Sequence, residues 1–419
     1  MRRLLTPLLL AAFLSTSAKA DPLELDPVVA ANVLAIHAQN PELRDDAFAK
    51  MGGSSVASKA FLYCFATPYV DLGDHADLQE TIDQFRTGRR NSFNRQSLAA
   101  GVSWNLRYVI GGRPAHFREE IDATRARWAL IFFGGNDAQN QNERVYARRL
   151  VYLVEQLAAM GVVPVLGSAS PRRNKTKDRW IQRFNAITRA VATHWYLPHV
   201  DYHGAMSELP RKGLARDGVH PNVLGRGGVR RACQLTEKGL RYGNNLRNFL
   251  TLEMLDALRR VVADTGTDSN ADADADADAG ADTDTGIHVD AGTHVDAGPD
   301  TDATVTLHDL PFSVVVEKSA LGVEAFPAGC GGEPGTRAYR VSLAVEEPTR
   351  LRMTALDLDR YQPRVLWVRV GEDGARCVKR RTQTLEVAAR PGLWDLIVQV
   401  PERGAEDGKM LILIDRNPR

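Results

Sequence analysis

The sequence contains few of the features that allow a protein to bind a metal, cross a membrane or bind nucleic acid. It has only four cysteines among 419 residues, Cys64, Cys233, Cys330 and Cys377, and none shows the close paired spacing of a zinc site. No stretch after the amino terminus approaches the roughly 20 apolar residues that a transmembrane helix needs. Aromatic residues make up 7% of the chain and are not interleaved with the basic ones, so nucleic acid is not an expected partner.

The first 20 residues have the layout of a cleavable secretory signal. Two arginines precede an apolar run from Leu4 to Leu14. The segment ends in Ala18-Lys19-Ala20, where small residues flank the lysine. We therefore expect export to the periplasm or the medium and a mature chain that begins near Asp21. An oxidising destination permits disulfides. We pair Cys330 with Cys377; Cys64 either pairs with Cys233 or both remain free and buried.

Residues 264–304 contain no Lys, Arg or Glu and almost no large apolar side chain, but they include twelve Asp. Such a segment cannot bury enough surface to offset its ordering entropy, which predicts a disordered linker. The alternating aspartates of 272–278 lack the glycine turn and the distal glutamate of a tight calcium loop. The preceding residues, 21–263, carry 33 Lys and Arg against 24 Asp and Glu, so a basic domain precedes an acidic linker.

The segment 21–263 alternates between short β-prone runs and long amphipathic stretches. This pattern is typical of βαβ units and predicts an α/β domain with a parallel sheet and helices on both faces. We expect strands at 47–51, 128–133, 161–166 and 197–202, and helices at 145–160, 180–194 and 245–262.

Three polar motifs follow the predicted strands, where an open parallel sheet carries its chemistry. They are Gly52-Gly53-Ser54-Ser55, Gly134-Gly135-Asn136-Asp137 and Asp217-Gly218-Val219-His220. Acyl transfer needs a hydroxyl nucleophile, a base, a carboxylate that orients the base, and donors for the oxyanion. Together the three motifs supply all of these groups.

These motifs resemble the sequence blocks of the SGNH, or GDSL-like, hydrolases over roughly residues 45–263. The resemblance implies a three-layer flavodoxin-like fold and an esterase that needs no cofactor and no metal. It implies Ser54 as nucleophile, His220 as base and Asp217 as its orienting carboxylate. Asn136 and the backbone of Gly101 would complete the oxyanion hole; Gly101 equally fits a helix cap. The expected substrate is a small-molecule or polysaccharide ester.

The first motif departs from the family pattern, because glycine or serine replaces the usual aspartate. In the register Gly52-Gly53-Ser54 the nucleophile is Ser54, and in the register Gly53-Ser54-Ser55 it is Ser55. The missing carboxylate also leaves open an alternative function, in which an impaired domain binds carbohydrate or a surface. A basic run after the predicted strand at 161–166 is either a solvated helix face or attracts an anionic substrate. It comprises Arg172, Arg173, Lys175, Lys177 and Arg179.

From residue 305 to 419 the chain changes to short alternating strands separated by turn residues, which predicts a β-sandwich. The Pro391-Gly392-Leu393-Trp394 segment is similar to an element of bacterial pre-peptidase C-terminal domains. Such a domain would bind a polysaccharide or the cell surface, or would only stabilise the protein. Because the polar linker offers no apolar surface for packing, we expect residues 21–263 to fold on their own. The predicted strands are 312–316, 338–343, 350–354, 364–370, 393–400 and 410–414.

Overall fold

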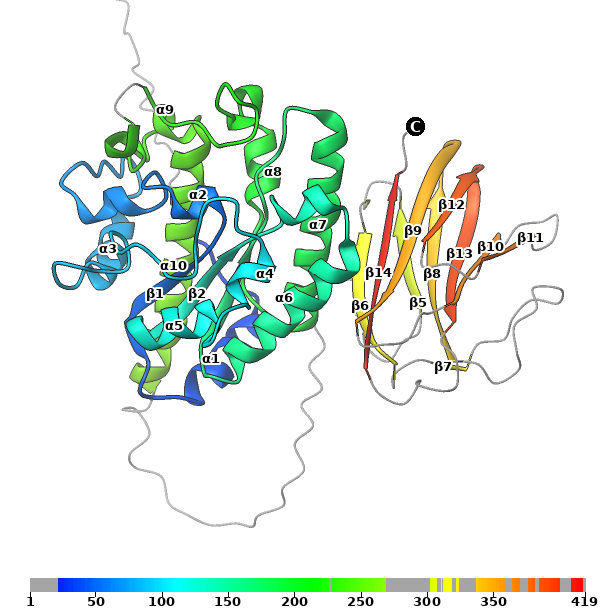
Figure 1. Cartoon of the computed structure of the whole chain (residues 1–419), viewed down its shortest axis with the longest axis horizontal. Coiled ribbons are helices and arrows are strands. Elements are labelled where there is room, and N and C mark those ends of the chain that lie inside the picture. The colour runs from blue at the N-terminus through cyan, green and yellow to red at the C-terminus, as the bar shows by residue number, and fades with distance from the viewer. Residues whose placement is uncertain are drawn as a thin grey trace, which may run out of the picture.

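The computed structural model describes residues 22–225, 228–268, 302–306, 310, 312–318, 322–323, 337–358, 364–369, 376–380, 384–399 and 408–416. An α/β part ends at Asp268 and an all-β part begins at Asp302 (Figure 1). The predicted signal segment, most of the predicted linker and Cys330 of the predicted Cys330–Cys377 pair lie outside the described residues.

The α/β part is built on a four-stranded parallel sheet in the order β1-β2-β3-β4. Its strands are β1 (Arg44–Gly52), β2 (Ala126–Phe132), β3 (Val163–Gly167) and β4 (His199–Val200). Every residue of β2 and β3 is buried, as expected for strands covered on both faces. The predicted parallel sheet is therefore confirmed.

Helices cover both faces of this sheet, with α6 and α7 packed together on one face and α1 and α10 on the other (Figure 1). Side-chain caps fix where they begin: Asn142 accepts from the N–H of Val145 before α6, and Asn174 accepts from the N–H of Lys177 before α7. The helices are α1 (Pro27–Ala38), α2 (Ser54–Ala57), α3 (Gln79–Phe85), α4 (Leu106–Val109), α5 (His116–Thr124), α6 (Glu143–Ala158), α7 (Lys175–His194), α8 (Tyr202–Ser207), α9 (Glu237–Leu240) and α10 (Gly243–Asp268). None of the helices in the described ranges combines the length and apolar content needed to cross a membrane.

The all-β part consists of two sheets, which confirms the β-sandwich prediction. One sheet has the order β11-β10-β13-β8-β5, with β7 beside β8, and the other has the order β12-β9-β14-β6. The strands are β5 (Asp302–Thr306), β6 (Phe312–Glu317), β7 (Gly322–Val323), β8 (Arg337–Val345), β9 (Thr349–Asp357), β10 (Arg364–Arg369), β11 (Arg376–Arg380), β12 (Thr384–Ala389), β13 (Gly392–Gln399) and β14 (Lys409–Arg416).

Strand β14 is buried on both of its faces. Met410, Ile412 and Ile414 belong to the core of the sandwich, whereas the alternate residues Leu411 and Leu413 belong to the core cluster of the α/β part. Successive side chains of a strand point to opposite faces of the sheet. The second face of this sheet therefore packs against the α/β part, where β6 and β14 contact α7 (Figure 1).

A buried ion network reinforces this contact. The guanidinium of Arg183 on α7 binds the carboxylates of Glu143 on α6 and Asp415 on β14, and it also donates to the hydroxyl of Thr354. The hydroxyl of Ser313 donates to the carbonyl of Ala186 at 2.6 Å. The polar linker led us to expect independent folding of residues 21–263, and this stays a prediction. The structure adds a packed apolar and ionic interface between the two parts.

Two boundaries also differ from the prediction. Helix α10 continues to Asp268, and β5 begins at Asp302, so both ends of the predicted linker belong to regular elements. The sequence patterns also missed the strands β5, β7, β11 and β12. In the α/β part, a disulfide joins Cys64 to Cys233, with Cα atoms 5.6 Å apart, and this confirms the pairing that the sequence left open.

Candidate functional site

Strands β1 and β2 end side by side, since Gly52 of β1 lies opposite Phe132 of β2. The first two motifs therefore start from the same edge of the sheet, as the parallel arrangement predicts. Ser54 is the first residue of α2, and Gly53 is its N-cap. The N–H of Ser54 thus belongs to the first turn of a helix, where it has no intrahelical acceptor.

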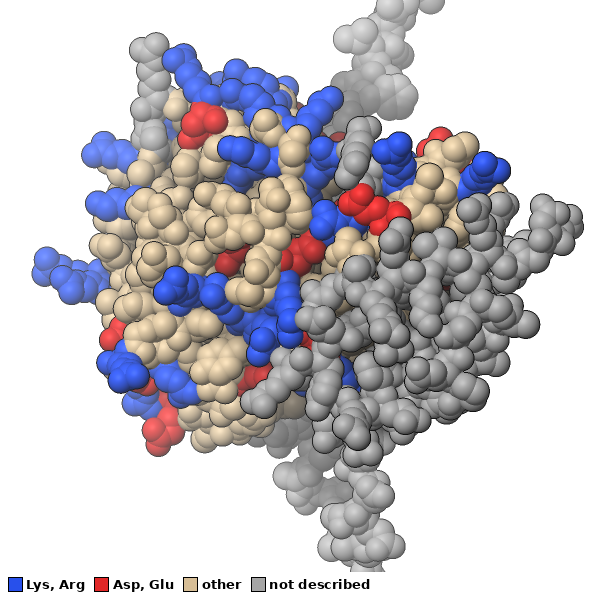
Figure 2. Space-filling model, turned by 45° about the vertical axis from the view of Figure 1, so that its right-hand side comes forward, with Lys and Arg blue, Asp and Glu red and all other residues tan. Residues whose placement is uncertain are grey.

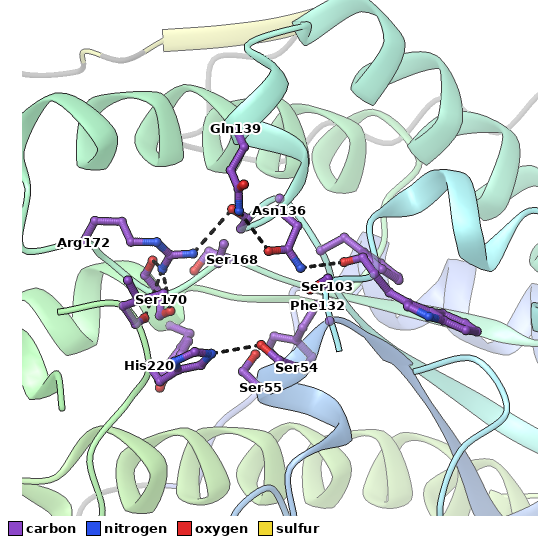
Figure 3. A pocket seen from close by; sticks show the side chains of 18 of the residues that line it. Ser54, Ser55, Ser103, Phe132, Asn136, Gln139, Ser168, Ser170, Arg172 and His220 are labelled. Carbon is purple, nitrogen blue, oxygen red and sulfur yellow. Dashed lines mark hydrogen bonds between the residues drawn. The ribbon is translucent and has the colours of Figure 1, made fainter. Parts of the chain in front are cut away.

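The hydroxyl of Ser54 lies 3.0 Å from Nε2 of His220 (Figure 3). Nδ1 of His220 lies 2.7 Å from a carboxylate oxygen of Asp217. The structure therefore brings Ser54, His220 and Asp217 into one hydrogen-bonded chain. Ser55 does not take this place: its carbonyl accepts from the guanidinium of Arg247 at 3.2 Å.

A compact loop holds the base and its carboxylate. The second carboxylate oxygen of Asp217 accepts from the backbone N–H groups of Val219 and His220 at 2.9 and 3.0 Å. Partial burial alone would raise the pKa of Asp217, but the hydrogen bond from the His220 ring and those two N–H groups lower the pKa to about 2. Asp217 is therefore ionised throughout the neutral range and can stabilise a protonated His220.

Asn136 lies across the pocket from His220 (Figure 3). One N–H of its amide donates to the carbonyl of Trp104 at 2.8 Å, and its oxygen accepts from Gln139 at 3.2 Å. A carboxamide has two N–H donors, so the second remains for a ligand.

The neighbouring Asp137 is buried and accepts from the N–H groups of Leu106 and Gly134. Its burial raises the pKa of Asp137 to about 6.

Gly53, the residue before Ser54, lies directly against the amide of Asn136. A Cβ at position 53 would be 2.9 Å from Nδ2 of Asn136 and 3.1 Å from the carbonyl oxygen of Trp104. Both distances are shorter than ordinary van der Waals contacts of a Cβ. The glycine therefore permits the position that Asn136 occupies in this chain.

Gly101 is not among the residues that line the pocket. Its N–H donates to the carbonyl of Gly52 at 3.1 Å, beside a parallel bridge between Gly52 and Ala100. The structure therefore places Gly101 next to β1 and not in the predicted oxyanion hole. The pocket is lined instead by the three residues that follow Gly101, which are Val102, Ser103 and Trp104.

The pocket has a volume of about 360 Å³ and is open to solvent on the side of the triad, where the His220 side chain is 50% exposed. Sequence patterns did not identify Ser168, Tyr202 or Arg247 as part of its wall. Of the two arginines in the pocket wall, sequence patterns identified only Arg172, as a member of the basic run. In the described ranges, no cluster of His, Cys, Asp and Glu could hold a metal ion.

Comparisons with known proteins agree with this geometry in one respect. Residues 72–226 match the model of the GDSL-like Lipase/Acylhydrolase family. This segment contains Asn136, Asp217 and His220, but it begins after Ser54. No curated protein matches the sequence.

Similarities to solved structures are weak. An acetylxylan esterase from Geobacillus stearothermophilus is 16% identical, with 50% of this chain and 93% of that chain covered and a TM-score of 0.35. A GDSL-like lipase from Bacteroides thetaiotaomicron is also 16% identical, with 54% and 98% covered and a TM-score of 0.34.

Proposed function

We propose, from the match of residues 72–226 to the GDSL-like lipase/acylhydrolase family, that the chain hydrolyses carboxylic esters with Ser54 as the nucleophile. The observation that carries the proposal is the hydrogen-bonded chain from Ser54 through His220 to Asp217, with distances of 3.0 and 2.7 Å. Ser54 lies outside the matched segment, so its role rests on this geometry alone.

In the proposed reaction, the Ser54 oxygen attacks the ester carbonyl while Nε2 of His220 takes the hydroxyl proton. The carbonyl oxygen becomes an oxyanion, which the N–H of Ser54 and the second N–H of Asn136 would stabilise. His220 then returns the proton to the leaving alcohol, and an acyl group remains on Ser54. Water attacks this acyl-enzyme with His220 again as the base, which releases the acid and restores the serine.

Ionised Asp217 has two functions in this scheme. It holds His220 with Nε2 facing the serine, and it stabilises the positive charge that the ring carries after each proton transfer. The aligned triad supports an enzyme over the alternative of an impaired binding domain, because neither function of Asp217 is needed for binding alone.

Export is part of the proposal. The arginine-led apolar segment at residues 1–20 supports it, as does the Cys64–Cys233 disulfide, because disulfides persist mainly in oxidising compartments. The proposed substrates are small-molecule or polysaccharide esters. Binding of a polysaccharide or of the cell surface through residues 305–419 remains a proposal that rests on the similarity of the Pro391–Trp394 segment.

Alanine variants of the two adjacent serines test the mechanism. We expect Ser54→Ala and His220→Ala each to lower kcat/KM for 4-nitrophenyl acetate by on the order of 10³-fold or more, because members of a triad act as a unit. Ser55→Ala is the matched control, since Ser55 contributes its carbonyl and not its hydroxyl to the contacts seen here. Loss of activity in Ser55→Ala with full activity in Ser54→Ala would reverse the assignment.

A further inference from the structure

Arg172 is a half-buried cation in the wall of the proposed active site. It lies in the loop between β3 and α7, and its guanidinium points into the pocket that contains Ser54 and His220 (Figure 3). Its pKa is lowered by burial, which two neighbouring carboxylates partly offset. A guanidinium nevertheless stays protonated in proteins, so the pocket wall carries a permanent positive charge.

This charge has no carboxylate partner in the described part of the chain. The two carboxylates that attract it, Asp178 and Asp217, are engaged elsewhere: Asp178 pairs with Lys212 and His203, and Asp217 pairs with His220. A charge withdrawn from water without a partner destabilises the protein. The cost of keeping this charge half-buried therefore indicates that the charge has a function.

Backbone carbonyls fix the guanidinium without neutralising it. Its Nη1 donates to the carbonyls of Ser170 at 2.8 Å, Pro171 at 3.1 Å and Val219 at 3.3 Å, and to the hydroxyl of Ser170 at 3.1 Å. Nη2 makes a long contact, 3.5 Å to the carbonyl of Gly135. One edge of the group thus holds it in place, and the Nη2 edge retains donors for a ligand.

Gly135 allows this edge to approach the pocket. A Cβ at position 135 would lie 2.8 Å from Nη2 of Arg172, so any larger residue would displace the guanidinium or its loop. The second glycine of the Gly-Gly-Asn-Asp motif therefore has a specific function here, which is to make room for a cation beside Asn136.

A second guanidinium adds to the positive charge of the same pocket. Arg247 is 1% exposed and lies in the pocket wall against the rings of Phe61 and Phe132, at 4.1 and 4.4 Å. Its Nε is buried without a hydrogen-bond partner. Lys and Arg also predominate over Asp and Glu on the face of the α/β part seen in Figure 2.

We propose that the pocket selects esters whose alcohol part carries a carboxylate, and that Arg172 is the group that binds this carboxylate. The inference rests on the proposed esterase function. The alcohol side is favoured because Arg172 is bonded to the carbonyl of Val219, next to His220, and His220 must reach the leaving oxygen to protonate it. Arginine binds carboxylates with paired, charge-assisted hydrogen bonds.

Two aryl acetates that differ only in charge provide the test: 3-acetoxybenzoate and its neutral analogue 3-acetoxybenzamide. We expect kcat/KM for the benzoate to exceed that for the benzamide by on the order of 10- to 100-fold. Arg172→Gln should abolish this preference, and Arg172→Lys, which keeps the charge, should retain part of it. Lys175→Gln removes the same charge from an exposed position at the start of α7 and should leave the preference unchanged.

A binding measurement separates this inference from the esterase proposal. Calorimetry on the Ser54→Ala protein should show 3-hydroxybenzoate binding on the order of 10-fold or more tightly than 3-hydroxybenzamide, and the difference should disappear in Ser54→Ala/Arg172→Gln. This result needs no turnover, so it stands even if neither ester is hydrolysed. Equal binding of the two ligands overturns the proposal. So does an Arg172→Gln enzyme that loses activity on both esters but keeps the preference, since Arg172 would then only brace the loops.

Discussion

The contact between the two parts of the chain predicts that a leucine in the last strand stabilises the whole protein. Leu413 of β14 is fully buried, and it belongs to the core cluster of the α/β part and not to the core of the sandwich. Truncation of a buried leucine to alanine removes its transfer free energy and leaves a cavity, which together cost about 2–5 kcal/mol. We therefore expect Leu413→Ala to lower the free energy of unfolding by that amount.

Without this contact, Leu413 would lie on the solvated face of the sandwich. Substitution of an exposed residue changes stability by only about 0.5 kcal/mol or less. Leu393→Ala provides the matched control, because Leu393 of β13 is 45% exposed. The two leucines thus distinguish a docked sandwich from a merely tethered one.

Urea unfolding followed by tryptophan fluorescence measures the difference. Trp180 of α7 lies 5.2 Å from the guanidinium of Arg352 on β9, so its emission reports on the interface. A docked protein should unfold in a transition that Leu413→Ala shifts to lower urea and Leu393→Ala does not. Equal midpoints for Leu413→Ala and the wild type would refute the interface.

Two further predictions concern the pocket. Gly53→Ala should lower kcat for a short-chain ester by on the order of 10- to 100-fold, because its Cβ would displace Asn136, a proposed oxyanion donor; unchanged kcat would show that Asn136 has room to move. Asp137 has a pKa of about 6 in the folded chain against 3.8 for the free group, so between about pH 4 and 6 the folded state holds a proton that the unfolded state has lost. The free energy of unfolding should therefore fall as pH rises through this window. It should fall less steeply in Asp137→Asn than in the wild type, and urea unfolding of the two proteins at several pH values measures the difference.

The fold was largely predictable because its signals are local. Short β-prone runs and helical periodicity identified the parallel strands and the long helices α6, α7 and α10. The interface with the sandwich was missed, although the sequence of β14 contains a sign of it. Residues 410–414 are continuously apolar and do not alternate with polar residues. Such a run indicates a strand buried on both faces, but it does not say which element covers the second face.

The site was predictable where chemistry restricts residue type. Ser54, Asp217, His220 and Asn136 stand in motifs that follow strands. The structure places Ser54, Asn136 and His220 in the wall of one pocket, and Asp217 hydrogen-bonds to His220. Gly101 was a weaker choice, since a lone glycine has many uses. The sequence also gave no reason to place Arg247 in the pocket, because an arginine in an amphipathic helix is ordinarily on the solvated side.

The most direct test of the central claim is covalent labelling of the nucleophile. A fluorophosphonate reacts with an activated serine hydroxyl and stays attached to its oxygen, so peptide mass spectrometry can tell adjacent serines apart. We predict a single adduct on Ser54 that is absent from His220→Ala, since the hydroxyl needs its base. An adduct on Ser55, or no adduct on either serine in protein that retains its Cys64–Cys233 disulfide, would contradict the account.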